Sequence, residues 1–131
     1  MDTKAIIDKF HMIPHEEGGY YAEIMKHDSP SVSQIYYLLE EDETAQWHRV
    51  GSDELWLFHD GGELLLTLGG TDNAPAPDKT FLLNQNDPSF LVPKNQWQTA
   101  KALGGAVLVS CVVYPAFTRE QWELYPKETD Q

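Results

Sequence analysis

The stretch QWHRVGSDELWLFHDG, residues 46–61, consists of two runs of β-strand residue types separated by a Gly-Ser turn. In a strand, side chains two positions apart share a face, so Gln46 and His48 are expected to point the same way. An imidazole and an amide then lie side by side on the first strand. We expect both side chains to face the interior of the fold.

The second run, residues 53–59, is largely apolar on both faces. The same alternation puts Glu54, Trp56 and Phe58 on one face and His59 on the opposite one. A strand that is apolar on both sides lines an interior with one face and packs against other parts of the protein with the other. The sequence therefore predicts Glu54 inside and His59 outside.

Similar short runs, separated by Gly, Pro, Asn and Asp, recur along most of the chain. Many short strands with regular turn signals and no helical period between them favour an all-β sandwich or closed barrel. The glycine pairs at 61–62 and 104–105 are expected to be turns between strands. The expected strands are residues 19–26, 33–40, 44–50, 53–59, 63–68, 79–84, 89–92, 96–101 and 105–114.

Both ends of the chain have a helical pattern. Residues 3–10 place apolar side chains on one face, with Asp2 or Thr3 as the N-cap. Residues 118–124 predict a C-terminal helix, in which Thr118 is the cap and Gln121 closes a capping box. A chain of 131 residues without a linker or internal repeat fits one domain, 1–131, with the barrel over about 19–114.

The chain is strongly acidic, with 21 Asp and Glu against 9 Lys and Arg and a formal net charge of −12. A nucleic-acid polymer is disfavoured because no Lys/Arg cluster is present to neutralise its phosphates. One local Arg or Lys can still hold an anionic ligand in a pocket. The apolar runs are far shorter than a membrane span, and we expect a cytoplasmic protein. Cys111, the single cysteine, is expected to be a small buried apolar residue.

The spacing around residue 54 resembles the first motif of the cupin family, in which two histidines one residue apart precede a glutamate and then a glycine. Glu54 and Gly61 match the spacing of that glutamate and glycine. His48 occupies the second histidine position, with one extra residue before Glu54, and Gln46 occupies the first. This resemblance implies a barrel whose interior receives His48 and Glu54.

Residues 93–98, PKNQWQ, are similar to the second cupin motif, which has a Pro-x-Gly turn followed by a histidine. Asn95 replaces the glycine, and both residues accept a positive φ. Gln98 replaces the histidine. The typical cupin metal site of three histidines and one glutamate would thus be reduced to His48 and Glu54, with Gln46 and Gln98 as neutral amides.

Five signatures in order make the chain similar to one branch of the superfamily, the DUF985 or cupin-5 family. The resemblance implies an all-β, single-domain cupin, a double-stranded β-helix or jelly-roll barrel, with short N- and C-terminal helices. It also implies a homodimer, for which the apolar residues Leu55, Leu57 and 107–113 are candidates. The signatures are residues 15–20 (HEEGGY), 35–39 (IYYLL), 47–50 with 53–56 (WHRV and DELW), 92–93 with 97–98 (VP and WQ) and 111–117 (CVVYPAF).

Three functions fit these residues. In the first, the barrel holds a carbohydrate-like or nucleotide-sugar-like ligand and acts as a metal-independent isomerase or epimerase. The similarity to nucleotide-sugar epimerase-type cupins implies His48 as base, Glu54 as the group that orients it, and a tyrosine as acid. In the second, the pocket binds or senses a small molecule without turnover. The residues expected to contact the ligand are Gln46, Trp56, Phe58, Gln98 and Tyr36.

In the third, the protein is a weak metal-binding enzyme. Amide oxygens are poor ligands for transition metals, and two strong ligands rarely hold such an ion against water. We therefore expect no cofactor and no tightly bound metal. A loosely bound divalent ion would use His48, Glu54 and Gln98.

Overall fold

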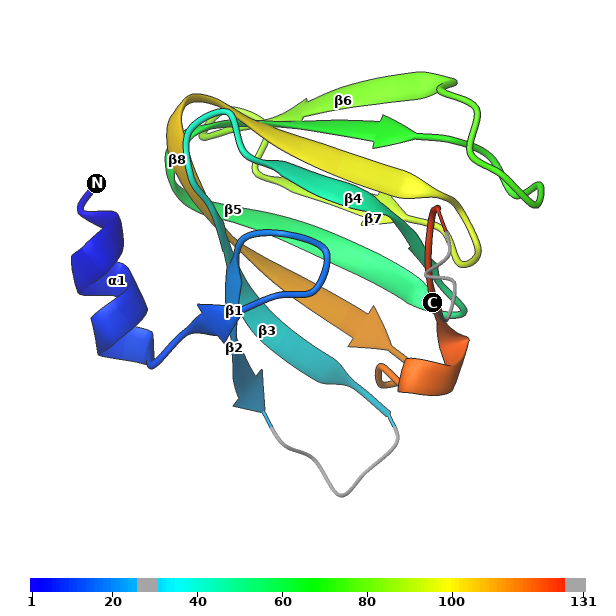
Figure 1. Ribbon diagram of the computed structural model, residues 1–131, viewed down its shortest axis with the longest axis horizontal. Helices are drawn as coiled ribbons and strands as arrows, with labels where there is room; N and C mark the ends of the chain where they lie inside the picture. Colours follow the sequence, from blue (N-terminus) through cyan, green and yellow to red (C-terminus); the bar gives the residue numbers. More distant parts are fainter. Residues whose placement is uncertain (26–30, 127–131) are drawn as a thin grey trace.

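The strands form one strongly curled sheet that closes into a jelly-roll barrel, and a single short helix lies outside it (Figure 1). The computed structural model describes residues 1–25 and 31–126. Within this part of the chain, the elements are α1 (Thr3–Phe10), β1 (Ile13–Pro14), β2 (Tyr20–Met25), β3 (Ser33–Leu39), β4 (Thr44–Val50), β5 (Asp53–Leu68), β6 (Lys79–Leu83), β7 (Ser89–Val92), β8 (Gln98–Tyr114), the 3₁₀-helix η1 (Arg119–Gln121) and β9 (Trp122–Leu124). The predicted all-β barrel architecture is confirmed.

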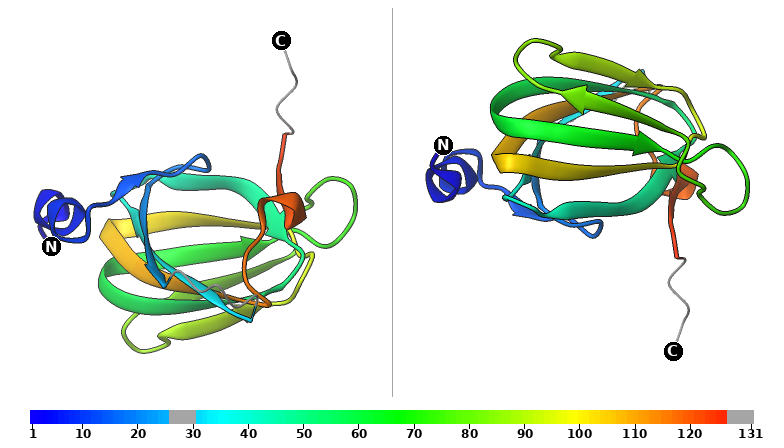
Figure 2. Two further views of the ribbon diagram at one scale, coloured as in Figure 1. Left: turned by 90° about the horizontal axis from the view of Figure 1, so that it is seen from below. Right: turned by 90° about the horizontal axis from the view of Figure 1, so that it is seen from above.

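Two long strands, β5 and β8, pair along most of their length and form the frame of the barrel. Strand β8 also pairs with β3 and β4, whereas β5 also pairs with β6 and β7. Figure 2 shows these strands curving around a common interior, with α1 standing apart at one end. The barrel is therefore built around one antiparallel pair, and the remaining strands are added at its edges.

The glycine pairs at 61–62 and 104–105 are bends within β5 and β8, so the prediction that they separate strands was wrong. Gly61 has a φ of +104°, and a Cβ there would overlap the carbonyl oxygen of Ala106. The register of the pair shifts on both sides of Gly61. Glycine lets the two strands bend together while staying paired, because it tolerates both the positive φ and the close backbone approach.

The packed core fills the part of the barrel away from the functional residues. Leu64 and Leu66 of β5 face inward and pack with Leu83, Ala100 and Ala102, all of which are buried. Side chains of this kind leave few voids when they interdigitate at normal protein density. The space available to a ligand is consequently confined to the other half of the barrel.

The predicted helix at residues 3–10 is confirmed, and the Asp2 side chain accepts a hydrogen bond from the Ala5 N–H. The apolar face of α1 packs on the outside of the sheet, in a cluster that includes Phe10, Leu38 and Leu108. None of the helices in the described part of the chain is long and apolar enough to cross a membrane.

The predicted C-terminal helix over 118–124 was wrong. The segment forms one 3₁₀ turn and then strand β9, and Thr118 makes no capping hydrogen bond through its side chain. β9 pairs with β4, where Trp122 lies opposite Val50 and Leu124 lies opposite His48. The open edge of β4 supplies hydrogen-bond partners for an extended segment, and this tertiary pairing overrides the local capping pattern.

The bend in β5 gives a prediction about stability. Gly61→Ala is expected to lower the free energy of unfolding by about 3 kcal/mol, since left-handed φ costs about 1–2 kcal/mol and the new Cβ also overlaps the neighbouring strand. Gly104→Ala is the matched control, because its φ is +70° but no atom lies within 4 Å of its Cβ position. It is expected to cost about 1 kcal/mol in urea denaturation. Equal losses in the two variants would show that the close approach at Gly61 is unimportant.

Candidate small-molecule site

One end of the barrel contains a cavity of about 220 Å³. Apolar side chains of β3, β4 and β8 form part of its wall, including Ile35, Val50 and Val113. The β1–β2 connection and the C-terminal segment close over it from opposite ends of the chain. The cavity is thus bounded by rigid strands at its base and by two loop-like segments at its mouth.

Two of the predicted site residues, His48 and Glu54, do line this cavity. Both are almost fully buried, at 2% and 7% exposure. Gln98 is buried next to them, and its amide group is fully engaged: Nε2 donates to Glu54 Oε1 at 2.6 Å, and Oε1 accepts from Trp56 Nε1 at 2.9 Å. Gln98 therefore holds the Glu54 carboxyl in position and has no carbonyl oxygen directed at a ligand.

The expectation that Gln46 points with His48 was wrong, because a β-bulge interrupts the alternation of β4. Ala45 pairs with Ala100 and His48 pairs with Gln98, so two residues of β4 oppose one residue of β8. The extra residue returns His48 to the inner face and leaves Gln46 outside the cavity. The Gln46 Nε2 instead donates to the carbonyl of Pro126 at 3.3 Å.

Glu17, on the β1–β2 connection, is a cavity residue that sequence reasoning missed. It is 7% exposed, and its Oε2 lies 3.4 Å from His48 Nδ1. Gly18 and Gly19 follow it with φ values of +112° and +72°, and they fold the chain back so that Glu17 points inward. This Gly-Gly pair is the signal that could have identified it, because adjacent glycines permit an unusual backbone course that can turn a neighbouring side chain inward.

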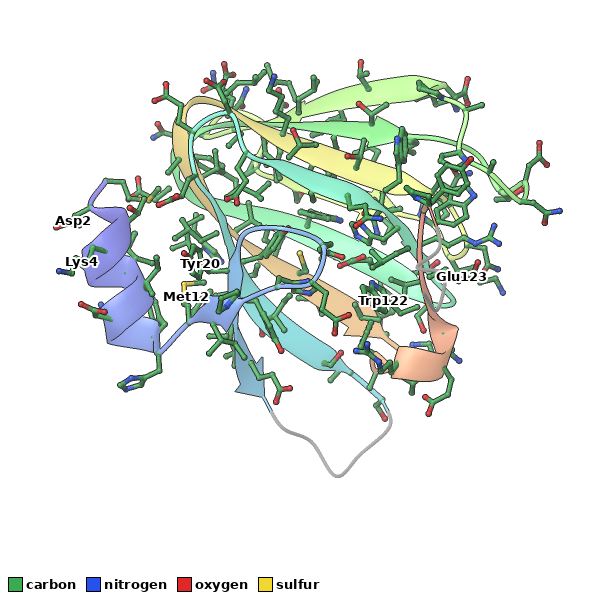
Figure 3. The ribbon with its side chains drawn as sticks, in the orientation of Figure 1. Asp2, Lys4, Met12, Tyr20, Trp122 and Glu123 are labelled. Atoms are coloured by element: carbon green, nitrogen blue, oxygen red, sulfur yellow. The ribbon has the colours of Figure 1, made fainter. Side chains whose placement is uncertain are left out.

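His15 and Trp122 complete the surroundings of Glu17. His15 Nε2 lies 3.9 Å from Glu17 Oε1, and the Trp122 side chain donates a hydrogen bond to the same carboxyl group. Trp122 comes from β9, where it lines the cavity while its neighbour Glu123 is exposed to solvent (Figure 3). The strand that replaces the predicted C-terminal helix therefore contributes directly to the site.

Burial determines the ionisation of this cluster. It raises the pKa of Glu17 from 4.5 to about 8 and also raises the pKa of Glu54. The same desolvation lowers the pKa of His48 and brings the pKa of His15 to about 4, with a further contribution from His48. Desolvation penalises whichever form is charged, so acids and bases move in opposite directions. At neutral pH Glu17 is a carboxylic acid, and the two histidines are neutral imidazoles.

The tautomer of His48 follows from its hydrogen bond to the backbone. Nδ1 lies 2.8 Å from the carbonyl oxygen of Gln46, and a carbonyl can only accept. Nδ1 therefore carries the proton in the neutral ring, and Nε2 carries the free lone pair. The arrangement supplies a neutral base, His48 Nε2, and a neutral acid, Glu17, at one cavity.

Three other residues expected to contact the ligand lie elsewhere. Trp56 is part of the packed core and donates to Gln98, and Phe58 packs at the edge of the same core. Tyr36 points out of the barrel and packs against Phe10 of α1, with ring centroids 4.6 Å apart. The alternation of side chains along β5 correctly placed Trp56 on the same face as Glu54. The interior around Trp56, however, is filled by the packed core, so no ligand can reach it. A tyrosine does line the cavity, and it is Tyr21.

The cavity residues do not fit the three-histidine metal site of typical cupins. Gln98, at the position of the last histidine, has both amide atoms committed within the protein. Within residues 1–25 and 31–126, no group of three or more His, Cys, Asp or Glu side chains is arranged to hold a metal ion. We therefore derive no chemical step through a metal.

The sequence matches the family described as "Cupin superfamily (DUF985)" over residues 4–125. A crystal structure of a Shewanella oneidensis protein is similar, with 30% identity, a TM-score of 0.79 and coverage of 95% of this chain and 85% of that one. A hypothetical protein from Leishmania major has 23% identity, a TM-score of 0.80 and coverage of 95% and 88%. A cupin 2 conserved barrel domain protein from Rhodopseudomonas palustris has 15% identity, a TM-score of 0.67 and coverage of 86% and 75%. Among curated proteins, none matches the sequence.

The raised pKa of Glu17 predicts how stability depends on pH. Between pH 4.5 and about 8 the folded protein holds a proton that the unfolded chain has released. This group therefore lowers the free energy of unfolding by about 1.4 kcal/mol for each unit that the pH rises in that interval. Glu17→Gln, which cannot ionise, is expected to flatten the dependence and to be more stable than the wild type at pH 9, as measured by urea denaturation across the pH range.

Glu16→Gln is the matched control for this measurement. Glu16 is exposed, and its hydrogen bonds to Arg119 lower its pKa, so it is ionised in both states over most of this interval. Its replacement is expected to keep most of the slope, with only a small lowering of the Glu17 pKa, because the Glu16 charge is a smaller cause of that shift than burial. A Glu17→Gln variant whose slope equals that of the wild type would show that Glu17 is not held in its protonated form.

Proposed function

The chain belongs to the DUF985 family of the cupin superfamily, and from that premise we propose that it is a metal-independent isomerase or epimerase acting on a small carbohydrate-like ligand. The observation that carries this proposal is the burial of His48, Glu17 and Glu54 around one cavity. These groups are at most 7% exposed and have shifted pKa values. Perturbed titratable groups that converge on a cavity are typical of sites that transfer protons.

His48 is the base in this proposal. Its ring is neutral at neutral pH because burial lowers its pKa, and the Gln46 carbonyl keeps the proton on Nδ1. Nε2 can then accept a proton from a carbon next to a carbonyl group, and the electron pair of the C–H bond moves to the carbonyl oxygen. Glu54, through its charge interaction with His48, stabilises the imidazolium that forms.

Glu17 is the acid. With a pKa of about 8 it carries a proton at neutral pH and can donate a hydrogen bond, or the proton itself, to the developing oxyanion. The Trp122 hydrogen bond orients its carboxyl group. The isomer forms when His48 delivers its proton to the former carbonyl carbon and the hydroxyl group of the neighbouring carbon loses its proton to the Glu17 carboxylate. An epimer forms when Tyr21, which also lines the cavity, protonates the original carbon from the opposite face, the enol returns its proton to Glu17, and exchange with solvent restores His48 and Tyr21. Both outcomes balance without an oxidant, a reductant or a metal.

The size and lining of the cavity support a ligand of monosaccharide size. Its volume of about 220 Å³ lies below the ~300–1,000 Å³ of sites for drug-sized ligands. A complete nucleotide-sugar would extend beyond it, with the sugar inside and the nucleotide outside. Tyr21 and Trp122 offer aromatic surface to the apolar face of a sugar, and the protonated Glu17 carboxyl offers a hydrogen bond to its hydroxyl groups.

A binding or sensing module without turnover is the alternative, since the same hydrogen-bonding groups can hold a ligand that remains chemically unchanged. Solvent exchange separates the two functions. A panel of aldoses, ketoses and 2-oxo acids is incubated with the protein in D₂O, and the loss of C–H signals next to the carbonyl is followed by NMR. Proton transfer predicts exchange with deuterium. Ligands that raise the melting temperature of the protein but never exchange would favour the binding module.

The proposed base gives a prediction about rate. His48→Gln is expected to reduce exchange by about 10²–10⁴-fold, because general base catalysis commonly contributes that much. His59→Gln is the matched control, since His59 is exposed on the outside of the barrel and is expected to leave the rate unchanged. Treatment of the wild type with EDTA is also expected to leave it unchanged. Full exchange activity in His48→Gln would refute the assignment of His48 as the base.

A further inference from the structure

An ion pair spans the mouth of the cavity. The Arg119 guanidinium donates from both terminal nitrogens to the Glu16 carboxylate, at 2.9 and 3.1 Å. Arg119 begins η1, and Glu16 belongs to the β1–β2 connection, so the pair joins the two segments that close over the cavity. Both residues line the cavity themselves. The geometry is the planar two-point contact in which arginine recognises a carboxylate.

Arg119 is the one Lys or Arg that lines the cavity among the residues that the structure describes. Its guanidinium lies over the ring of Trp122, 5.3 Å from the centroid. Stacking on an aromatic wall orients a planar guanidinium and leaves its edge available for hydrogen bonds. The positive charge is thus held at the rim of a cavity whose deeper groups are His48, Glu17 and Glu54.

A ligand anion can replace Glu16 as the partner of Arg119 at little cost in free energy. The side chains of Arg119 and Glu16 are 68% and 50% exposed, and exposed pairs of this kind contribute little to stability. The Glu16 carboxylate already occupies the position that the anionic group of a ligand would take. Below it, Glu17 is uncharged at neutral pH, so an anion at the mouth meets no buried carboxylate there.

We propose that Arg119 is a specificity-determining residue of the proposed small-molecule site, on which this inference rests, and that it binds a carboxylate or phosphate group of the ligand after displacing Glu16. The ligand is then a sugar acid or sugar phosphate, with its anionic group at the mouth and its carbonyl end directed toward His48 and Glu17. Glu16 keeps the guanidinium oriented in the free protein and competes with the ligand for it.

Binding of charge-matched sugars tests this proposal. The probes are D-glucuronate, D-glucose 6-phosphate, D-glucose and D-glucosamine, titrated calorimetrically at neutral pH and low salt. At least one of the two anionic sugars is expected to bind about tenfold more tightly than glucose, and glucosamine no more tightly, because a charge-assisted bidentate contact is available only to the anions. The two anions distinguish a carboxylate from a phosphate site.

Variants of Arg119 and Glu16 distinguish a role of Arg119 in ligand binding from a purely structural role of the ion pair. Arg119→Gln is expected to bring anionic and neutral sugars to within about twofold of each other. Glu16→Gln is expected to increase the affinity for anionic sugars about three- to tenfold, because it removes the competing carboxylate. A structural ion pair predicts losses in both variants. Arg49→Gln is the matched control, since Arg49 also lies over a tryptophan, Trp97, and pairs with a glutamate, but outside the cavity.

The inference is overturned if neither anionic sugar binds more tightly than glucose, or if Glu16→Gln weakens anion binding as Arg119→Gln does. Its failure is distinguishable from failure of the proposed catalysis. Exchange that requires His48 but shows no preference for anionic substrates would remove the anion site and keep the proton transfer. Anion binding that requires Arg119 without any exchange would keep the anion site and remove the proton transfer.

Discussion

Two carboxyl groups, those of Glu17 and Glu54, are buried at one cavity, and salt bridges to Arg or Lys are absent from both among the residues that the structure describes. Burying a carboxylate without a cation costs far more than burying a carboxylic acid, so burial raises the pKa of both groups, and Glu17, with a pKa of about 8, keeps its proton at neutral pH. Desolvation also keeps the His48 ring neutral. Glu17 and His48 can therefore coexist as a neutral acid and a neutral base at neutral pH, and the proton transfer proposed for them would depend on the exclusion of water from the cavity.

Hydrogen bonds within the barrel keep this polar cluster compatible with an apolar core. Trp56 donates to Gln98, and Gln98 donates to Glu54, so the chain of donors ends on the cavity carboxyl. Every polar atom of the Gln98 side chain that could coordinate an ion is used in this chain. Gln98, at the position of a cupin metal ligand, thus serves to orient the Glu54 carboxyl group, and a fully satisfied network of this kind rigidifies the wall of the site.

The sequence predicted those parts of the fold that local periodicity controls. Helix 3–10 and the alternation that puts Glu54 and Trp56 on one face were correct, since strand parity holds wherever the ladder is regular. Parity failed at Gln46 because a bulge adds one residue opposite Thr99, and no glycine marks it. The pattern at 118–124 satisfied a capping box, but the open edge of β4 was visible only in three dimensions. Glu17 was missed because it lies in a loop and its partner, His48, lies on a strand far from it in the sequence.

The residues that local sequence predicts least well are those that bring the site together. Glu17 reaches the cavity through a Gly-Gly loop near one end of the chain, and Trp122 reaches it through a strand near the other. Each depends on the other, because Trp122 donates to Glu17 and Arg119 pairs with the adjacent Glu16. The barrel alone provides His48 and Glu54 on rigid strands, which favours precise placement of a base. The acid and the charged mouth lie on the β1–β2 connection and the C-terminal segment, which cover the cavity, and the proposed proton transfer would depend on their keeping water out of it.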